Sequence, residues 1–337
     1  MKYVVTGGAG FIGSHVTEAL LRRGHDVVVV DNLFSGSRAN LDGASAAAGE
    51  LAGELTLLTA DILDETAVHT ALEGAEAVFH QAAIASVPRS FDDPASTLRV
   101  NIEGTATLLE ACRRQSVGLV VLASSSSVYG DSLILPKHED MALEPLSPYA
   151  LSKQVGEGLL AIWARQYGIR TVALRYFNIF GPRQDPASEY AAVVPRFILR
   201  MLDGLSPIIY GDGRQSRDFT FVGNAVDANL LAAGIDLEDG RALPGSAGCS
   251  VVNIGVGERY SLLELVEALN GILGTSLDPE FAPARVGDVR DSQAAIERAQ
   301  DVIGYVPRVG FDVGLERTVA WYLERFENPT VLASQAC

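Results

Sequence analysis

The fold of this chain is decided near its start by Thr6-Gly7-Gly8-Ala9-Gly10-Phe11-Ile12-Gly13. The stretch joins a short apolar run to a segment with the apolar spacing of a helix. Gly7 allows a tight turn, Gly10 lets a pyrophosphate approach the backbone, and Gly13 lets the helix pack closely on the sheet. The N-terminus of such a helix offers free N–H groups and a partial positive charge to phosphates. The spacing therefore predicts a dinucleotide-binding turn between a strand and a helix.

Strand and helix patterns alternate outward from this turn. Apolar, β-branched runs predict strands at 2–6, 26–30, 54–59, 75–80, 118–123 and 171–175. Helical spacing predicts helices at 14–23, 101–115, 151–167, 261–273 and 313–326, whereas 40–53 fits a loop or a short exposed helix. Alternating strands and helices imply parallel pairing with right-handed crossovers. The expected fold is α/β, a Rossmann-type doubly wound parallel sheet, and 337 residues leave room for a second, smaller lobe.

Acidic residues at strand ends indicate which dinucleotide is bound. Asp31 ends the second predicted strand, where a carboxylate accepts both hydroxyls of the adenosine ribose and repels a 2′-phosphate. NAD is therefore favoured over NADP. Asp61 follows the third predicted strand, and it either meets the adenine edge or simply forms a turn.

A tyrosine, a lysine and a serine run form the candidate catalytic group. Tyr149 and Lys153 stand four residues apart, so they share one helix face, and the ammonium is expected to lower the phenol pKa. Ser124–Ser127 follow an apolar strand, at the sheet edge where ligands bind in open α/β folds. Neither a Ser-His-Asp pattern nor G-x-S-x-G is present, so serine hydrolase chemistry is not supported.

Composition excludes several classes of partner. The chain has 42 acidic and 26 basic residues and a net charge of −16, which argues against binding nucleic acid or anionic membranes. No apolar run is long enough to span a membrane, and no signal peptide is visible. Three scattered cysteines predict neither a disulfide framework nor a zinc site. We expect a cytoplasmic protein without a metal.

Taken together, the motifs resemble those of the extended short-chain dehydrogenase/reductase family over nearly the whole chain. The resemblance rests on TGGAGFIG at 6–13, DN at 31–32, HQAA at 80–83, VN at 100–101, SSSSVYG at 124–130, YALSK at 149–153 and RYFN at 175–178. Within the family the chain is similar to nucleotide-sugar 4-epimerases, through HQAAIASVPRS at 80–90, PLSPYALSK at 145–153, GPRQDP at 181–186, YAAVVPRF at 190–197, YGDGRQSRDF at 210–219 and GDVRDS at 287–292.

The resemblance implies a function, a set of site residues and a division into lobes. It implies an NAD-dependent enzyme that inverts carbon 4 of a UDP-sugar through a 4-keto sugar, with Ser125, Tyr149 and Lys153 as catalytic residues. The implied cofactor residues are Gly7, Gly10, Phe11, Ile12, Gly13, Asp31, Asn32, Ser35, Gly36, Asp61, Ile62, Gln81, Ala82, Ala83, Asn101, Ser124, Tyr149, Lys153 and Tyr176. The implied substrate residues are Ser86, Ser125, Ser126, Tyr149, Asn178, Gln184, Val193, Tyr210, Arg217, Arg285, Asp288 and Ser292, with Arg290 as a further candidate. Residues 1–177 plus about 218–248 would form the NAD-binding domain, and about 178–217 plus 249–330 the sugar-binding lobe. A homodimer through helices near 97–115 and 151–167 is also expected.

Four residues bear on the choice of sugar and of reaction. Ser292 falls where the family has a gatekeeper, and a small residue there admits an N-acetyl group, so UDP-GlcNAc and UDP-GalNAc lead, with UDP-Glc and UDP-Gal next. UDP-glucuronate and UDP-N-acetylglucosaminuronate rank lower, because Asp185 would repel a sugar carboxylate. Dehydratases and decarboxylases of the same fold carry a carboxylate where this chain has Ser126 and Ser127. A non-catalytic NAD-binding sensor is the alternative of a different class.

Overall fold

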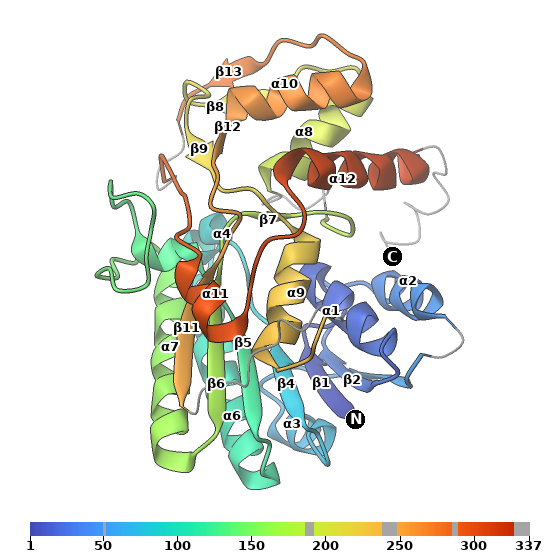
Figure 1. Ribbon diagram of the computed structural model, residues 1–337, viewed down its shortest axis with the longest axis vertical. Coiled ribbons are helices and arrows are strands. Elements are labelled where there is room, and N and C mark those ends of the chain that lie inside the picture. The colour runs from blue at the N-terminus through green and yellow to red at the C-terminus, as the bar shows by residue number, and fades with distance from the viewer. Residues whose placement is uncertain (50–51, 186–191, 238–247, 285–288, 327–337) are drawn as a thin grey trace.

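A parallel seven-stranded sheet forms the centre of the molecule (Figure 1). The computed structural model describes residues 1–49, 52–185, 192–237, 248–284 and 289–326. The strands lie in the order β11-β6-β5-β4-β1-β2-β3, and all neighbours are parallel. Their bounds are β1 Lys2–Thr6, β2 Asp26–Asp31, β3 Leu55–Thr59, β4 Ala77–His80, β5 Leu119–Ser125, β6 Arg170–Tyr176 and β11 Cys249–Ile254. The chain reverses direction across the sheet next to β1, which places the ligand-binding edge at the ends of β1 and β4.

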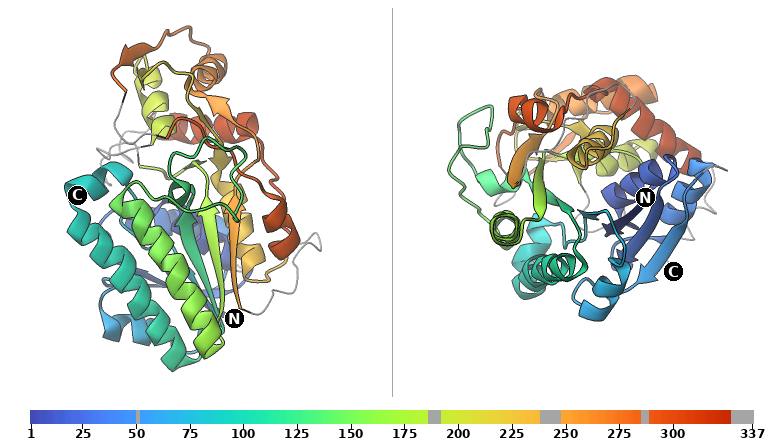
Figure 2. Two further views of the ribbon diagram at one scale, coloured as in Figure 1. Left: turned by 90° about the vertical axis from the view of Figure 1, so that its left-hand side faces the viewer. Right: turned by 60° about the horizontal axis from the view of Figure 1, so that its bottom comes forward.

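Helices cover both faces of this sheet, each over its own apolar core (Figure 2). One face carries α1 Phe11–Leu21, α2 Arg38–Ala48, α9 Val222–Ala232 and α11 Glu297–Ile303. The other carries α3 Glu65–Ala71, α6 Gly104–Gln115 and α7 Pro148–Tyr167, with α6 and α7 side by side. Because β1, β4 and β5 are covered on both faces, they read as continuous apolar runs rather than alternating ones.

Short elements between β4 and α7 line the carboxyl edge of the sheet. They are α4 Val87–Asp92, α5 Pro94–Leu98, a π-helical turn at Arg99–Glu103 and a 3₁₀ turn at Ser126–Tyr129. Ser86 and Asp93 cap α4 and α5 through their side-chain oxygens. This region therefore holds a compact set of turns rather than one long helix.

A second group of elements lies beyond the carboxyl ends of the strands (Figure 1). It has its own apolar core, which includes Phe197, Ile209, Leu265 and Phe311. Its elements are β7 Ile179–Phe180, α8 Val193–Leu202, β8 Ile208–Tyr210, β9 Ser216–Arg217, β10 Thr220–Phe221, β12 Tyr260–Ser261, α10 Leu262–Leu273, β13 Glu280–Ala282 and α12 Phe311–Phe326. These residues and the sheet edge face each other, so a ligand on that edge meets side chains from both groups.

The doubly wound sheet predicted from the sequence is confirmed, with differences in detail. Residues 38–48 form a helix, which was one of two alternatives. β11 pairs with β6 inside the large sheet, so the boundary expected at 249 is wrong for residues 249–254, and α11 packs there too. The predicted helix at 101–115 begins with the π-helical turn. Among the described helices none is long and apolar enough to cross a membrane.

Candidate active site

The glycine turn after β1 has the geometry of a diphosphate cradle. Gly7 has φ +68°, a conformation that side chains disfavour. A Cβ on Gly13 would lie 2.1 Å from the Gly7 carbonyl oxygen, so only glycine lets α1 begin so close to the turn. Gly10 precedes α1 and offers no side-chain cap, which leaves the N–H groups of Phe11, Ile12 and Gly13 in the first helical turn available. These residues fit the diphosphate of a dinucleotide.

Asp31 is held at the end of β2 beside this turn. Its Oδ2 accepts a hydrogen bond of 2.9 Å from the N–H of Ala9, and its Oδ1 accepts one of 2.8 Å from Leu33. Burial raises the pKa of Asp31, and the two N–H groups oppose that rise. Asn32, which follows Asp31, donates a hydrogen bond of 2.8 Å to Oδ2 of Asp61. The loop after β2, which also carries Ser35 and Gly36, is thereby tied to Asp61 and Ile62 after β3.

The loop after β4 closes the other side of the glycine turn. Gln81 donates from its backbone to the Thr6 carbonyl (3.0 Å), and its amide contacts the hydroxyl of Tyr176 at the end of β6. Ala82 lies so close to Gly7 that a Cβ there would be 2.6 Å from the Ala82 nitrogen. Asn101 accepts a hydrogen bond of 2.8 Å from Ile84, just after Ala83. These predicted cofactor residues therefore surround one site.

The three predicted catalytic residues meet at the carboxyl end of β5. The Ser125 hydroxyl lies close enough to the Tyr149 phenol to lower its pKa. The Ser125 Oγ also accepts hydrogen bonds from the N–H (3.2 Å) and the hydroxyl (2.9 Å) of Ser127. The Lys153 ammonium lies 5.7 Å from the centre of the Tyr149 ring. Tyr149 occupies the first turn of α7, where the Ser147 hydroxyl caps the helix.

One expectation about this group is wrong. The sequence predicted that Lys153 lowers the phenol pKa of Tyr149. Burial instead raises the pKa of Tyr149, and the hydrogen bond with Ser125 is the contact that opposes the rise. The reason is geometric, because the ammonium of Lys153 is directed at the carbonyl oxygen of Ala123. Burial lowers the pKa of Lys153 to about 8.

A buried ion pair beneath the catalytic residues was missed from the sequence. Glu157 lies one turn along α7 from Lys153 and binds Arg175 of β6 through two hydrogen bonds of 2.9 and 2.7 Å. The side chains of Glu157 and Arg175 are 7% and 4% exposed, so each buried charge is stabilised by the other. Ser124, a predicted cofactor residue, donates a hydrogen bond of 2.6 Å to Glu157 instead of facing the site. Two features of the sequence could have indicated this pair. They are Glu157, eight residues after Tyr149, and Arg175, a charged residue within a predicted buried strand.

Two of the predicted substrate residues, Asn178 and Ser292, contact each other. Asn178 has φ +31° and donates a hydrogen bond of 3.1 Å from its amide to the Ser292 hydroxyl. Gln184 donates to the Ile179 carbonyl (3.3 Å), and its own side-chain oxygen is buried without a hydrogen-bond partner among the residues that the structure describes. Ser86 is used as the cap of α4, through a hydrogen bond of 3.2 Å from the Arg89 nitrogen.

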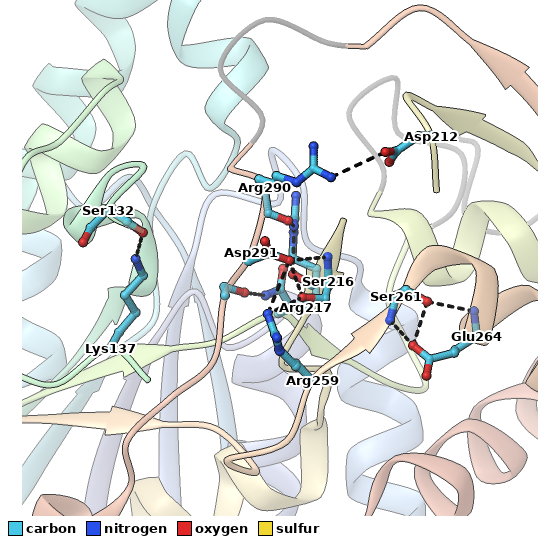
Figure 3. A network of polar contacts seen from close by, with 12 residues as sticks. Ser132, Lys137, Asp212, Ser216, Arg217, Arg259, Ser261, Glu264, Arg290 and Asp291 are labelled. Carbon is cyan, nitrogen blue, oxygen red and sulfur yellow. Dashed lines mark hydrogen bonds and ion pairs between the residues drawn. The ribbon is translucent and has the colours of Figure 1, made fainter. Parts of the chain in front are cut away.

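Arginines gather around Asp291 in the second lobe (Figure 3). Arg217 donates to the carbonyls of Ser216 (3.0 Å) and Arg290 (2.8 Å). Arg259, which the sequence analysis did not single out, lies 3.6 Å from Asp291. Arginine guanidinium groups suit phosphate oxygens, so this cluster fits a second diphosphate.

The remaining predicted substrate residues lie at the rim or outside the described chain. Val193 begins α8, and Tyr210 ends β8 with the guanidinium of Arg196 at 5.6 Å from its ring centre. Ser126 begins the 3₁₀ turn after Ser125. Arg285 and Asp288 lie outside the described residues. Within the described residues, no three His, Cys, Asp or Glu side chains group as a metal site.

Comparison with known proteins gives consistent matches. The model of the NAD dependent epimerase/dehydratase family matches residues 3–243. The UDP-glucose 4-epimerase of Mycolicibacterium smegmatis is 40% identical over 96% of this chain and 98% of its own. Among solved structures, the UDP-N-acetylglucosamine 4-epimerase of Methanobrevibacter ruminantium M1, in complex with UDP-N-acetylmuramic acid, has a TM-score of 0.87 at 38% identity, over 96% of this chain and 98% of that one. The UDP-glucuronic acid 4-epimerase of Bacillus cereus, in complex with UDP-glucuronic acid and NAD, has a TM-score of 0.84 at 34% identity, over 96% and 99%.

Proposed function

The chain belongs to the NAD dependent epimerase/dehydratase family, and from this premise we propose that it inverts carbon 4 of a UDP-sugar. Its cofactor is NAD. The leading substrates are UDP-GlcNAc and UDP-GalNAc, followed by UDP-Glc and UDP-Gal. The observation that carries the proposal is that Ser125, Tyr149 and Lys153 come together at the carboxyl end of β5, where Ser125 lowers the phenol pKa and the Lys153 ammonium lies 5.7 Å from the ring centre.

Each catalytic residue has a defined task in this proposal. When bound, NAD supplies a carbon that accepts a hydride from the sugar and returns it. The phenol oxygen of Tyr149 takes the proton of the sugar 4-hydroxyl and gives it back. Ser125 bridges the phenol and that hydroxyl, because its Oγ is held by the Ser127 hydroxyl and lies beside the phenol, whose pKa it lowers. Lys153 holds α7 against the end of β5 through its hydrogen bond to the Ala123 carbonyl, which keeps the phenol in place beside Ser125.

Epimerisation is favoured over elimination by the residues after Ser125. Ser126 and Ser127 carry hydroxyls, and the Ser127 hydroxyl donates to Ser125. Loss of water or CO₂ from the 4-keto sugar requires a group poised to move a further proton or to promote the cleavage, and carboxylates do this in the related branches. With serines at these positions, we expect the 4-keto carbon to take its hydride back, which completes epimerisation.

The substrate lobe supports an N-acetylated sugar. Ser292 is small, and its hydroxyl is bonded to Asn178, which keeps its side chain away from the space that a larger residue would fill. The buried side-chain oxygen of Gln184 is an unused acceptor that suits an amide N–H. Arg217 and its neighbours would bind the UDP diphosphate, with about 178–217 and most of 255–330 as the sugar-binding lobe.

A homodimer is proposed on the face of α7. Leu151 and Ile162 are 42% and 45% exposed there, whereas Leu108 and Leu109 of α6 belong to the core. Paired α7 helices would cover the exposed residues. Sedimentation of the purified chain should give twice the monomer mass of 35.8 kDa, and Ile162→Glu should give the monomer.

The proposed activity is tested by incubation with UDP-GlcNAc, UDP-Glc and UDP-glucuronate in separate reactions, followed by ¹H NMR of the products. UDP-GalNAc from the first reaction supports the proposal. If UDP-galacturonate is the sole product, the second candidate, a uronate 4-epimerase, is supported. Similarity to the B. cereus enzyme favours this candidate, whereas the exposed carboxylate of Asp185 opposes it. A stable 4-keto-6-deoxy sugar or released CO₂ would identify elimination or decarboxylation instead. If none of the three UDP-sugars is converted, the remaining alternative is a non-catalytic NAD-binding sensor. That alternative predicts that Tyr149→Phe leaves the biological output intact.

A further inference from the structure

A cation–π contact joins two loops that the catalytic proposal does not use. The guanidinium carbon of Arg89 lies 4.3 Å from the centre of the Phe34 ring. Phe34 belongs to the loop after β2, and Arg89 belongs to α4, after β4. The ring of Phe34 is 56% exposed and has no aromatic partner among the described residues. The contact with Arg89 therefore links the loop after β2 to α4 through side chains.

The strand order places this contact across the dinucleotide turn. β2 and β4 are the two neighbours of β1 in the sheet, and all three strands run parallel (Figure 1). Their following loops consequently leave the same edge, one on each side of the turn after β1. A side-chain contact from one loop to the other passes in front of that turn.

Direct contacts support this placement. On one side, the Ser37 nitrogen donates a hydrogen bond of 3.0 Å to the carbonyl of Ala9, and a Cβ on Gly36 would lie 2.9 Å from Ala9. On the other side, Ala82 packs against Gly7. Both loops thus touch the glycine turn at their bases, and Phe34 and Arg89 meet farther out.

The backbone at both ends of the contact is fixed by short-range hydrogen bonds. The nitrogen of Phe34 donates to the Asn32 side chain (3.0 Å), and the nitrogen of Arg89 donates to Ser86 (3.2 Å). Hydrogen bonds with Ser96 lower the pKa of Asp93, and the Arg89 guanidinium adds to this effect. Short-range hydrogen bonds therefore hold the backbone at each end, and side chains alone make the contact between Phe34 and Arg89.

We propose that Arg89 and Phe34 form a strap over the diphosphate of NAD and slow the release of the cofactor. The strap covers the outer side of the cradle, and the positive charge of Arg89 lies on the side from which two phosphates would leave. An enzyme that regenerates NAD in each turnover has no need to release it, so a slow exit is compatible with catalysis. The strap concerns the cofactor alone and holds for any sugar.

The rate of NAD release tests the strap without an activity assay. The full chain is loaded with radiolabelled NAD, excess unlabelled NAD is added, and the retained label is followed by rapid filtration. Phe34→Ala and Arg89→Ala should each release NAD about 3- to 10-fold faster, the range of an exposed to partly desolvated cation–π contact. The double variant should be no faster than the faster single variant, because either change opens the same contact.

Matched variants separate the strap from general effects. Phe34→Tyr keeps the ring face and should release NAD at the wild-type rate. Phe91→Ala removes a ring of similar exposure, 52%, from the same helix as Arg89 and should have no effect. Release within twofold of wild type in both Phe34→Ala and Arg89→Ala would overturn the proposal, as would rates that multiply in the double variant. The thermal unfolding midpoint of each variant is measured in parallel. A midpoint equal to that of the wild type shows that the variant remains folded.

Discussion

The ammonium of Lys153 donates a hydrogen bond of 2.8 Å to the carbonyl oxygen of Ala123, two residues before Ser125. This bond fixes α7, which carries Tyr149, against the end of β5, which carries the catalytic hydroxyl. Lys153 is thereby a positioning residue as well as a charge. The arrangement explains how a phenol and a serine on separate elements keep hydrogen-bond contact.

Removing the phenol hydroxyl should abolish the reaction and leave the fold intact. Tyr149→Phe loses the group that we propose takes the 4-hydroxyl proton, so we expect kcat to fall by about 10²–10⁴-fold with little change in the binding of NAD. Ser125→Ala should lower kcat by a smaller factor, because the phenol remains. NMR-monitored turnover measures both. Tyr167→Phe, at the exposed far end of α7, is the control and should behave as wild type.

Removing Glu157 should be among the most damaging single changes in the sheet domain. Glu157→Ala leaves Arg175 buried without its carboxylate, which costs about 3–5 kcal/mol in the free energy of unfolding. Glu110→Ala breaks surface pairs with Arg113 and Arg114 and should cost about 1 kcal/mol or less. Urea denaturation followed by circular dichroism measures both values. Equal losses in the two variants would contradict the role given to the buried pair.

Stability should fall in acid through a buried histidine. His80 lies between the hydroxyls of Thr6 (2.7 Å) and Thr105 (3.0 Å), and burial, with Lys153 adding to it, lowers its pKa to about 3. Below its ordinary pKa of about 6.5 the unfolded chain binds a proton that the folded chain refuses. The contribution of neutral His80 is therefore complete above pH ~6.5 and is lost as the pH falls toward 3, by at most about 1.4 kcal/mol per pH unit.

The matching variant is His80→Gln, which keeps a polar side chain between the two threonines. Its free energy of unfolding should depend less steeply on pH between about 6.5 and 4 than that of the wild type. His15, whose pKa burial lowers to about 4, contributes in the same direction and remains in both proteins. Urea denaturation at several pH values gives the slopes. Parallel curves would show that His80 does not titrate as described.

The sequence predicted the parts of this molecule that depend on local spacing. The glycine turn, Asp31 at the end of β2 and the helical pair Tyr149 and Lys153 all follow from short-range geometry, and the structure has each in the expected element. The ion pair of Glu157 and Arg175 depends on two elements meeting in space, and no short pattern encodes it. The direction of the Lys153 ammonium was missed for the same reason, since the Ala123 carbonyl belongs to a different strand.

The short segments of the second lobe show the same limit. β7, β9, β10 and β12 have two residues each, so period-two alternation has no length over which to appear. β11 was missed because its residues Cys249–Ile254 follow a stretch of sequence rich in small residues, and they form a strand by pairing with β6. In both cases tertiary contacts override weak local preference.

Enlarging Ser292 should separate N-acetylated from plain sugars. Its hydroxyl is bonded to Asn178 and its side chain is buried, so a tyrosine there must extend into the sugar-binding space. Ser292→Tyr should lower kcat/KM for UDP-GlcNAc by about 10–200-fold or more and change kcat/KM for UDP-Glc far less, because only the acetamido group needs that space. Ser292→Ala, which removes the bond to Asn178 but keeps the space, should leave the ratio of the two kcat/KM values near that of the wild type. If Ser292→Tyr lowers both values equally, Ser292 does not control the choice of sugar, and the N-acetyl group lies elsewhere in the site.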